Sequence, residues 1–283
     1  MKIGMNLFLW CDRFRPEFFP LLAELKAAGF DGVEIPAGDY SAAEVKEIRA
    51  VLSAEGLACT VATLLTAEHN PISADAAIRA AALEKITADI ALSHALGAES
   101  LVGPMHSGHK VFHGRGPNQQ EFQYCQEFLH SVGSEAAQAD VVLAVEPLNR
   151  FECYFLNTAE QAARLMDAVD LPGVGVLYDT HHANIEENCV YNAICGLDSR
   201  IKQIHISESH RGTPGTGTVD WESSFRALTN MNYQGWVVIE AFASDVPGFP
   251  DTVNIWRDCF ASKTEVYKQG MALIRAGQEM QPG

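Results

Sequence analysis

The sequence lacks long runs of apolar residues. The N-terminal stretch, residues 1–13, is apolar over too few positions for the core of a signal peptide, and it has no small-residue cleavage site. No other segment approaches the roughly 20 apolar residues that a transmembrane helix needs. We therefore expect a soluble protein that has no membrane partner.

Paired cysteines are also missing. The chain has seven cysteines, an odd number, scattered along its length and without a C-x-x-C pair. This pattern is typical of free thiols in a reducing compartment. We therefore predict a cytoplasmic protein without a disulfide framework.

Basic residues are few. Lys and Arg number 20 against 36 Asp and Glu, which gives a formal net charge of −16 and a pI near 5.0. Nucleic acids and anionic membranes require a basic face, so neither is an expected partner. Hydrophobic residues make up 47% of the chain, enough for a sizeable core.

Linkers and low-complexity segments are absent, and short strand-like and helix-like segments alternate along the whole chain. Strands are predicted at 2–6, 32–35, 57–63, 100–103, 141–146, 173–179, 201–206 and 236–240. Helices are predicted at 18–28, 41–55, 74–96, 119–139, 158–169, within 186–195, and at 222–231 and 252–276.

This alternation predicts an α/β fold with one domain over residues 1–283, a closed (β/α)₈ TIM barrel. We expect a flexible C-terminal tail from about residue 277. An open doubly wound sheet is the alternative, but it would normally have a glycine-rich phosphate turn after its first strand, and this sequence has none.

Four polar residues stand near the ends of apolar strand runs: Glu146, Asp179, His205 and Glu240, spaced 33, 26 and 35 residues apart. Parallel strands would bring all four to the same end of the barrel. Any one carboxylate there could instead cap a helix or form a surface ion pair, but four on consecutive strands argue against that interpretation. Three carboxylates and an imidazole suit Mn²⁺, Mg²⁺ or Co²⁺ better than a thiolate-type zinc site.

Several other polar residues follow these strand ends. Glu152 could turn back over the site, and of His181 and His182 we expect one to face inward. Arg211 could hold a substrate oxygen or an enediolate. The alternative is that Arg211 is a solvent-exposed cation of the loop without a function in the site.

Three further histidines, His106, His109 and His113, follow the fourth predicted strand. Their spacing fits no standard metal-ligand motif. We interpret this segment as a mobile polar loop.

The segments EPLNRFE, YDTHHANIEE, HISESHRGTPGTGTVDW and VVIEAF, in this order, resemble the ketose 3-epimerase family, whose familiar members act on D-tagatose and D-psicose (D-allulose). That family lies within the xylose-isomerase-like sugar isomerase/epimerase barrels, and the resemblance extends over nearly the whole chain. It implies a metal-dependent epimerisation of a free ketose at C3, by deprotonation and reprotonation through an enediolate.

The resemblance also implies roles for single residues. Glu146, Asp179, His205 and Glu240 would bind one divalent cation, Mn²⁺ first, with Co²⁺ or Mg²⁺ as alternatives. Glu146 and Glu240 would also be the catalytic acid/base pair. The substrate-binding residues would be Glu152, His182 and Arg211, at the O1–O2 end of the sugar.

The family also implies a homodimer or homotetramer. Two places depart from its pattern: His181 stands where an aromatic residue is usual, and the loop GPMHSGHKVF differs from the tagatose and psicose enzymes. The particular ketose is therefore left open.

Other functions remain as alternatives. A related barrel sugar isomerase or dehydratase, of the hydroxypyruvate isomerase or inosose dehydratase type, would use the same kind of metal site. An apurinic endonuclease-like enzyme would need more histidine ligands and a basic groove for nucleic acid. The net charge of −16 argues against such a groove. A non-catalytic sugar-binding protein is the last alternative.

Overall fold

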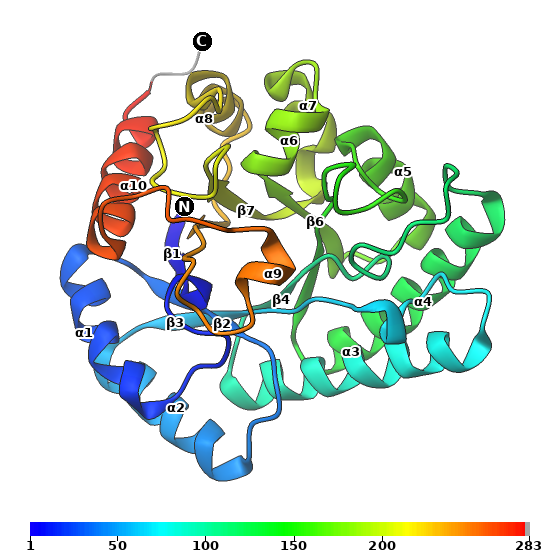
Figure 1. Cartoon of the computed structure of the whole chain (residues 1–283), viewed down its shortest axis with the longest axis horizontal. Helices are drawn as coiled ribbons and strands as arrows, with labels where there is room; N and C mark the ends of the chain where they lie inside the picture. Colours follow the sequence, from blue (N-terminus) through cyan, green and yellow to red (C-terminus); the bar gives the residue numbers. More distant parts are fainter. Residues whose placement is uncertain (281–283) are drawn as a thin grey trace.

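The computed structural model of the protein describes residues 1–280, which form a barrel of parallel strands surrounded by helices (Figure 1). Within this range each strand pairs with the next along the chain, and β8 pairs with β1 to close the barrel. The strands are β1 (Lys2–Asn6), β2 (Gly32–Pro36), β3 (Ala58–Ala62), β4 (Ser100–Gly103), β5 (Val142–Val145), β6 (Val174–Asp179), β7 (Ile201–Ser207) and β8 (Trp236–Glu240). The predicted closed (β/α)₈ barrel is confirmed.

The helices lie outside the strands. The α-helices are α1 (Phe19–Ala28), α2 (Ala42–Glu55), α3 (Ala76–Leu96), α4 (Gln119–Gln138), α5 (Ala159–Val169), α6 (Thr180–Glu186), α7 (Val190–Leu197), α8 (Trp221–Asn230), α9 (Pro250–Val253) and α10 (Lys263–Gln278). Short 3-10 helices are η1 (Leu7–Leu9), η2 (Pro16–Phe18), η3 (Ala67–His69) and η4 (Asp198–Arg200). Capping boxes begin α2, α4 and α5, at Ser41, Asn118 and Thr158.

The main core lies between the strands and the helices, because the Val, Ile and Leu side chains of the strands are buried there. The barrel interior is different. Small apolar residues, Ala62, Val102, Ala144 and Leu177, form a separate cluster inside it. A group of buried polar residues shares the interior: Asn6, Glu34, Thr60, Gln203 and His205.

The predicted helix within residues 186–195 corresponds to α7, which begins at Val190 and continues past the predicted end to Leu197. The sequence did not predict α6, which begins immediately after Asp179. The Asp179 side chain accepts hydrogen bonds from the backbone N–H groups of His181 and His182, and so caps a helix that begins at the end of the strand.

The predicted final helix, residues 252–276, is confirmed from residue 263 onward by α10, but its start is wrong. Asn254 adopts a left-handed conformation, with a φ of 57°, and ends α9. Ser262 caps α10 through the backbone N–H of Glu265. The prediction of a flexible tail from about residue 277 is untested: α10 continues through Gln278, and residues 281–283 lie outside the described residues.

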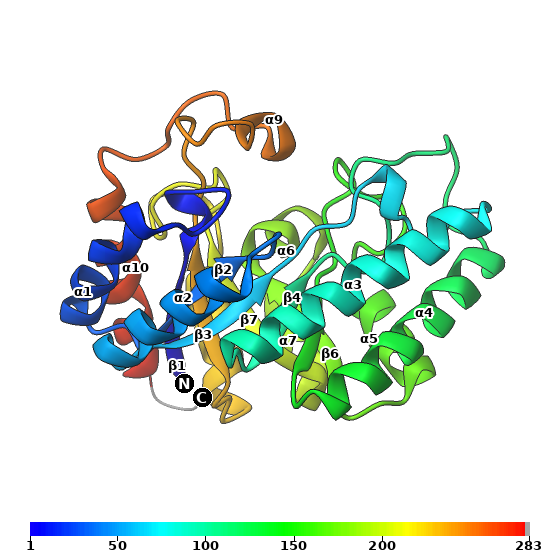
Figure 2. The same ribbon diagram turned by 90° about the horizontal axis from the view of Figure 1, so that it is seen from below.

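The long connections gather at one end of the barrel. Figure 2 shows α9 at the end opposite the N-terminus, above the carboxyl ends of the strands. None of the helices in residues 1–280 is long and apolar enough to cross a bilayer.

Candidate active site

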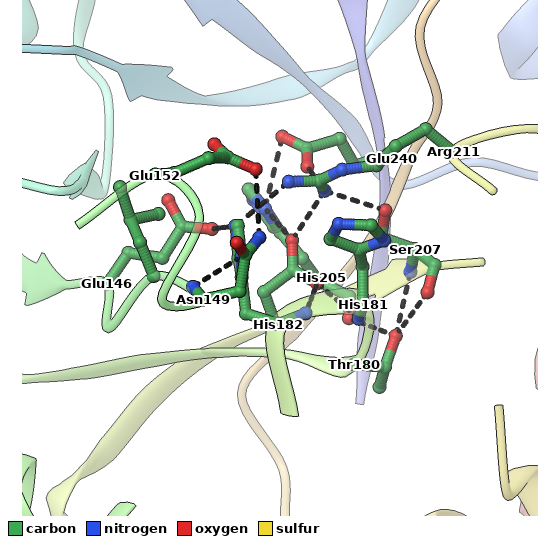
Figure 3. A network of polar contacts seen from close by, with 12 residues as sticks. Glu146, Asn149, Glu152, Thr180, His181, His182, His205, Ser207, Arg211 and Glu240 are labelled. Carbon is green, nitrogen blue, oxygen red and sulfur yellow. Dashed lines mark hydrogen bonds and ion pairs between the residues drawn. The ribbon is translucent and has the colours of Figure 1, made fainter. Parts of the chain in front are cut away.

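The four predicted metal ligands come together at the carboxyl end of the barrel. Asp179 and Glu240 are the last residues of β6 and β8, His205 lies near the end of β7, and Glu146 directly follows β5. Each offers a ligand atom, and these atoms all lie within 4.8 Å of one another. All four residues are buried, and Figure 3 shows the polar contacts around them.

His205 is held at one ring nitrogen and open at the other. Its Nε2 lies 2.9 Å from Oε1 of Glu34, a residue of β2 whose side chain is completely buried. Its Nδ1 lies 3.3 Å from Oε1 of Glu240 and 3.8 Å from Oδ2 of Asp179, and it has no hydrogen-bond partner. A buried imidazole nitrogen without a partner, surrounded by carboxylate oxygens, fits a metal ligand.

The electrostatics fit a cation as well. Burial would lower the pKa of His205, but the carboxylates of Glu34 and Glu240 raise it well above its ordinary value. A proton on Nδ1 would therefore stand where a divalent cation would bind, and cation binding would release it.

The two glutamates of the group have pKa values shifted in opposite directions. Burial raises the pKa of Glu146 well above its ordinary value, and the negative charges of Asp179 and Glu240 add to this. Burial also acts to raise the pKa of Glu240, but the positive charges of His205 and Arg211 outweigh it and lower the pKa. Two adjacent carboxyl groups with different proton affinities are typical of an acid/base pair.

Asp179 uses its two carboxylate oxygens for different purposes. Oδ1 caps α6, at 2.6 Å from the backbone nitrogen of His181. Oδ2 faces the site and accepts a hydrogen bond of 2.9 Å from Nη1 of Arg211. The cap fixes the direction in which the second oxygen points.

Arg211 reaches into the centre of the group from the loop after β7. Its Nη1 also donates to Oε2 of Glu240 at 2.6 Å and to Oγ of Ser207 at 2.8 Å. Its guanidinium lies over the ring of Phe242, 4.9 Å from the centroid. Arg211 is 7% exposed, so the solvated-loop alternative is wrong.

A buried carboxylate shapes the loop that carries Arg211. Glu208 accepts hydrogen bonds from the backbone N–H groups of Ser209, Gly215 and Val219 and from the indole of Trp221. The carbonyl of Glu208 accepts from the backbone N–H of Arg211, whose φ is 60°. The loop is thus folded around one side chain.

Of the two adjacent histidines, His182 lines the cavity. Its Nδ1 accepts hydrogen bonds from the backbone and side-chain N–H groups of Asn149, at 3.0 and 2.9 Å. Its Nε2 lies 2.8 Å from Nη2 of Arg211 and 3.5 Å from Oε1 of Glu146. His181 is also buried but points to the carbonyl of Glu208, at 3.2 Å.

Glu152 turns back over the site. Its Oε1 accepts from Nδ2 of Asn149 at 2.8 Å, and its Oε2 lies 3.1 Å from Nε2 of His109. Burial acts to raise the pKa of Glu152, but the contact with His109 and the positive groups nearby lower it.

The three loop histidines do not share one environment. His106 is completely buried, with Nε2 2.9 Å from the carbonyl oxygen of Glu146, whereas His109 lines the cavity and His113 is exposed. The interpretation of this segment as a mobile polar loop is wrong for its first half, which is built into the mouth of the barrel.

Polar and apolar side chains both line the cavity. The polar ones include Glu146, Glu152, His182, His205, Arg211, Glu240 and His109. The apolar ones include Phe8, Leu64, Val102, Leu148, Phe242, Phe249 and Val253. Among them, Phe249 stacks on Phe8, with ring centroids 4.7 Å apart, and meets Phe242 edge-on at 5.2 Å.

A second group of potential ligands overlaps the first. Glu152, His181 and His182 also offer atoms within 4.8 Å of one another. The guanidinium of Arg211 contacts His182 there, and its positive charge opposes a cation at that place. The group around His205 is therefore the better metal site.

Four residues around the site were not predicted to belong to it: Glu34, Asn149, Glu208 and His109. Glu34 interrupts the apolar run of β2, in GVEIP, and this charge within a buried strand is a usable signal. Asn149 and Glu208 lie inside motifs that were already recognised. For His109 the sequence offered no signal beyond the unusual loop.

Comparisons with known proteins show the family of the chain. A family model for xylose isomerase-like TIM barrels matches residues 22–276. The ketose 3-epimerase of Arthrobacter globiformis is 31% identical over 278 residues, which cover 97% of this chain and 96% of that protein. The L-ribulose 3-epimerase of Mesorhizobium japonicum is 30% identical over 281 residues, with coverage of 98% and 94%.

Solved structures of similar proteins share the whole fold. An L-ribulose 3-epimerase has a TM-score of 0.93 and 30% identity, covering 99% of this chain and 95% of its own. The D-allulose 3-epimerase of Methylomonas sp., in complex with D-allulose, has a TM-score of 0.92 and 25% identity, with coverage of 98% and 96%. The chain therefore belongs to the xylose isomerase-like TIM barrel family and, within it, to the ketose 3-epimerases, and it is an enzyme of the isomerase class.

Proposed function

We propose that the protein epimerises a free ketose at C3 and depends on a divalent cation for this reaction. The observation that carries the proposal is that Glu146 and Glu240, two buried carboxyl groups, belong to one group of four metal-ligating residues. Relatives named ketose 3-epimerase, L-ribulose 3-epimerase and D-psicose 3-epimerase support a ketohexose or ketopentose as the substrate.

Glu146, Asp179, His205 and Glu240 would hold the cation, with Mn²⁺ as the first choice and Co²⁺ or Mg²⁺ as alternatives. When bound, the cation would supply Lewis-acid polarisation of the ketose carbonyl, which acidifies the neighbouring C–H bond. The open Nδ1 of His205 supports this assignment.

Glu146 and Glu240 would move the proton. One carboxylate removes the proton from C3, and the other, protonated, returns a proton to the opposite face, which inverts the centre. The proton taken up by the first carboxylate goes to solvent, and the second takes up a proton from solvent, so the composition of the sugar is unchanged and both groups are restored. The opposite pKa shifts of the two groups agree with this division of roles.

His182 and Arg211 offer a place for a sugar oxygen. Because Nδ1 of His182 accepts from Asn149, the proton of a neutral imidazole is on Nε2. That nitrogen lies 2.8 Å from Nη2 of Arg211, so two donors stand side by side, with Oε1 of Glu146 3.5 Å from Nε2. A substrate oxygen beside both nitrogens would accept from both, and Glu152 would accept from a neighbouring hydroxyl.

An exchange experiment tests the reaction. The protein with Mn²⁺ is incubated in D₂O with a panel of ketohexoses and ketopentoses, and the products are analysed by NMR. A C3 epimerase should place deuterium at C3, whereas an aldose–ketose isomerase would place it at C1 or C2 and a dehydratase would give an unsaturated product. Absence of deuterium at C3 for every ketose would contradict the proposal.

Two variants and chelation test the residues. Glu146→Gln and Glu240→Gln should each lower kcat by a factor of about 10² or more, as expected for loss of a catalytic acid or base. Glu222→Gln, an exposed position on α8, is the control and should leave kcat unchanged. Full activity after exhaustive chelation would rule out the role of the cation.

The homodimer or homotetramer implied by the resemblance stays a prediction, as does the cytoplasmic location. Light scattering of the purified protein would decide the first, and fractionation of the source cells the second.

A further inference from the structure

His109 is a cavity residue that no part of the proposed mechanism uses. Its Nε2 lies 3.1 Å from Oε2 of Glu152, with the two side chains only 8% and 14% exposed. Because a carboxylate only accepts hydrogen bonds, Nε2 carries a proton and donates it to Glu152. The contact therefore holds one oxygen of a residue that faces the substrate cavity.

The backbone holds His109 in this place. Its N–H donates to the carbonyl of Leu65 at 2.8 Å, and the next residue, Lys110, donates its N–H to the carbonyl of Glu152 at 2.9 Å. The Lys110 side chain reaches the segment over the barrel mouth, with Nζ 3.1 Å from the carbonyl of Asp251 and 2.9 Å from Oδ1 of Asn254. These contacts of His109 and Lys110 fix the backbone that carries the imidazole.

The second oxygen of Glu152 is also held. Oε1 accepts from Nδ2 of Asn149 at 2.8 Å, and the same amide contacts His182. With a donor on each oxygen, the carboxylate has one orientation, and each oxygen retains a lone pair for a sugar hydroxyl. Without His109, one of these two restraints is lost.

The position of Glu152 indicates which hydroxyl it binds. Through Asn149 it is connected to His182 and Arg211, the pair that would bind an oxygen at the reacting end of the ketose. The cavity also has an apolar part, where Phe249 contacts Phe8 and Phe242. Two hydroxyls flank the carbonyl carbon, one on C1 and one on C3. The C3 hydroxyl is attached to the carbon that Glu146 and Glu240 would deprotonate, so the hydroxyl left for Glu152 is the one on C1.

We propose that His109 is a positioning residue that holds the Glu152 carboxylate as the acceptor for the C1 hydroxyl of the ketose, and so determines specificity for a sugar with that hydroxyl. This inference rests on the proposed C3 epimerisation. Glu152 touches the substrate but is not one of the acid/base pair, so the interaction is made equally in the ground state and the transition state. Its loss should raise KM and leave kcat nearly unchanged.

The test compares a ketose with its 1-deoxy analogue. The holoenzyme with Mn²⁺ is prepared as wild type, as His109→Leu, which keeps bulk without a donor, and as His109→Gln, which keeps a donor. His113→Leu is the matched control, because His113 lies in the same loop but is exposed and does not line the cavity. KM and kcat are measured for both sugars, and thermal unfolding confirms that each variant is folded.

For the ketose, His109→Leu should raise KM about tenfold, the effect of a lost hydrogen bond to a charged group, with kcat within about twofold. For the 1-deoxy analogue, KM should change less than about twofold, because the hydroxyl that Glu152 accepts from is missing. His109→Gln should restore most of the affinity for the ketose, and His113→Leu should resemble wild type.

Equal KM increases for the two sugars would overturn the proposal, as would an unchanged KM in His109→Leu. Either result is distinct from failure of the proposed function, in which the wild-type protein itself would place no deuterium at C3 of any ketose.

Discussion

At the scale of the residue, the contacts of His205 orient its imidazole ring so that one nitrogen can bind a cation. Glu34 accepts from Nε2 at 2.9 Å, so the lone pair for a cation is on Nδ1. Three further side chains hold Glu34 in place: Nδ2 of Asn6 at 2.8 Å, Oγ1 of Thr60 at 2.9 Å, and Nε2 of Gln203. A carboxylate behind a ligating imidazole fixes its tautomer and raises its basicity.

Glu34→Gln should therefore weaken Mn²⁺ binding by a factor of about 10 to 100, although Glu34 itself is not a ligand. Calorimetric titration of the metal-free protein with Mn²⁺ measures the change in Kd. Glu99→Gln is the control, because Glu99 is paired with Lys2, far from the site in the barrel. An unchanged Kd for Glu34→Gln would show that the carboxylate does not support the ligand.

At the scale of the element, the loop between β7 and α8 positions Arg211. It turns around the Glu208 carboxylate, and Gly217 packs directly against that side chain. A Cβ atom added to Gly217 would overlap Oγ of Ser209 and Oε1 of Glu208. The loop therefore has no space for a larger residue at this position.

Gly217→Ala should displace Glu208 and, through it, the guanidinium of Arg211. We expect kcat/KM to fall about tenfold or more, since small displacements of positioned groups are costly. Gly116→Ala is the matched control: Gly116 also lies in a loop, and a Cβ atom there would meet no neighbour within 4 Å. Steady-state kinetics of the two variants, at equal metal loading, measures the difference. If Gly217→Ala and Gly116→Ala had the same kcat/KM, the proposed link between the loop and Arg211 would be contradicted.

The two errors in the predicted helices, the missing α6 and the start of the final helix, have local causes. Asp179 was recognised as a strand end, but its role as the cap of α6 was not, because a short helix with two histidines has no clear apolar period. The split between α9 and α10 depends on the left-handed Asn254 and the Ser262 cap, which are weak local signals within a helical composition.

At the scale of the whole molecule, the site joins four neighbouring parts of the barrel. Its proposed ligands come from β6, β7, β8 and the residue after β5, so a bound cation would link strands that the chain reaches over nearly 100 residues. Binding only to the folded state stabilises that state.

Mn²⁺ at about 100 times its Kd should stabilise the metal-free protein by about 2.7 kcal/mol, which is a rise of several degrees in Tm. Asp179→Asn should abolish this rise, because the amide can still cap α6 but no longer provides an anionic ligand. Differential scanning calorimetry with and without Mn²⁺ measures both. A rise of equal size in the variant would place the stabilising cation elsewhere.

The sequence by itself determined the barrel and the meeting of the four proposed ligands, because buried parallel strands have a local signature and their carboxyl ends meet at one place. Only the tertiary structure decided that Glu34 supports His205 and that His109 holds Glu152. Glu34 of β2 meets His205 of β7 across the barrel, and His109 of the loop after β4 meets Glu152 of the loop after β5. Such contacts depend on strand register and on long-range packing, which no local pattern of residues records.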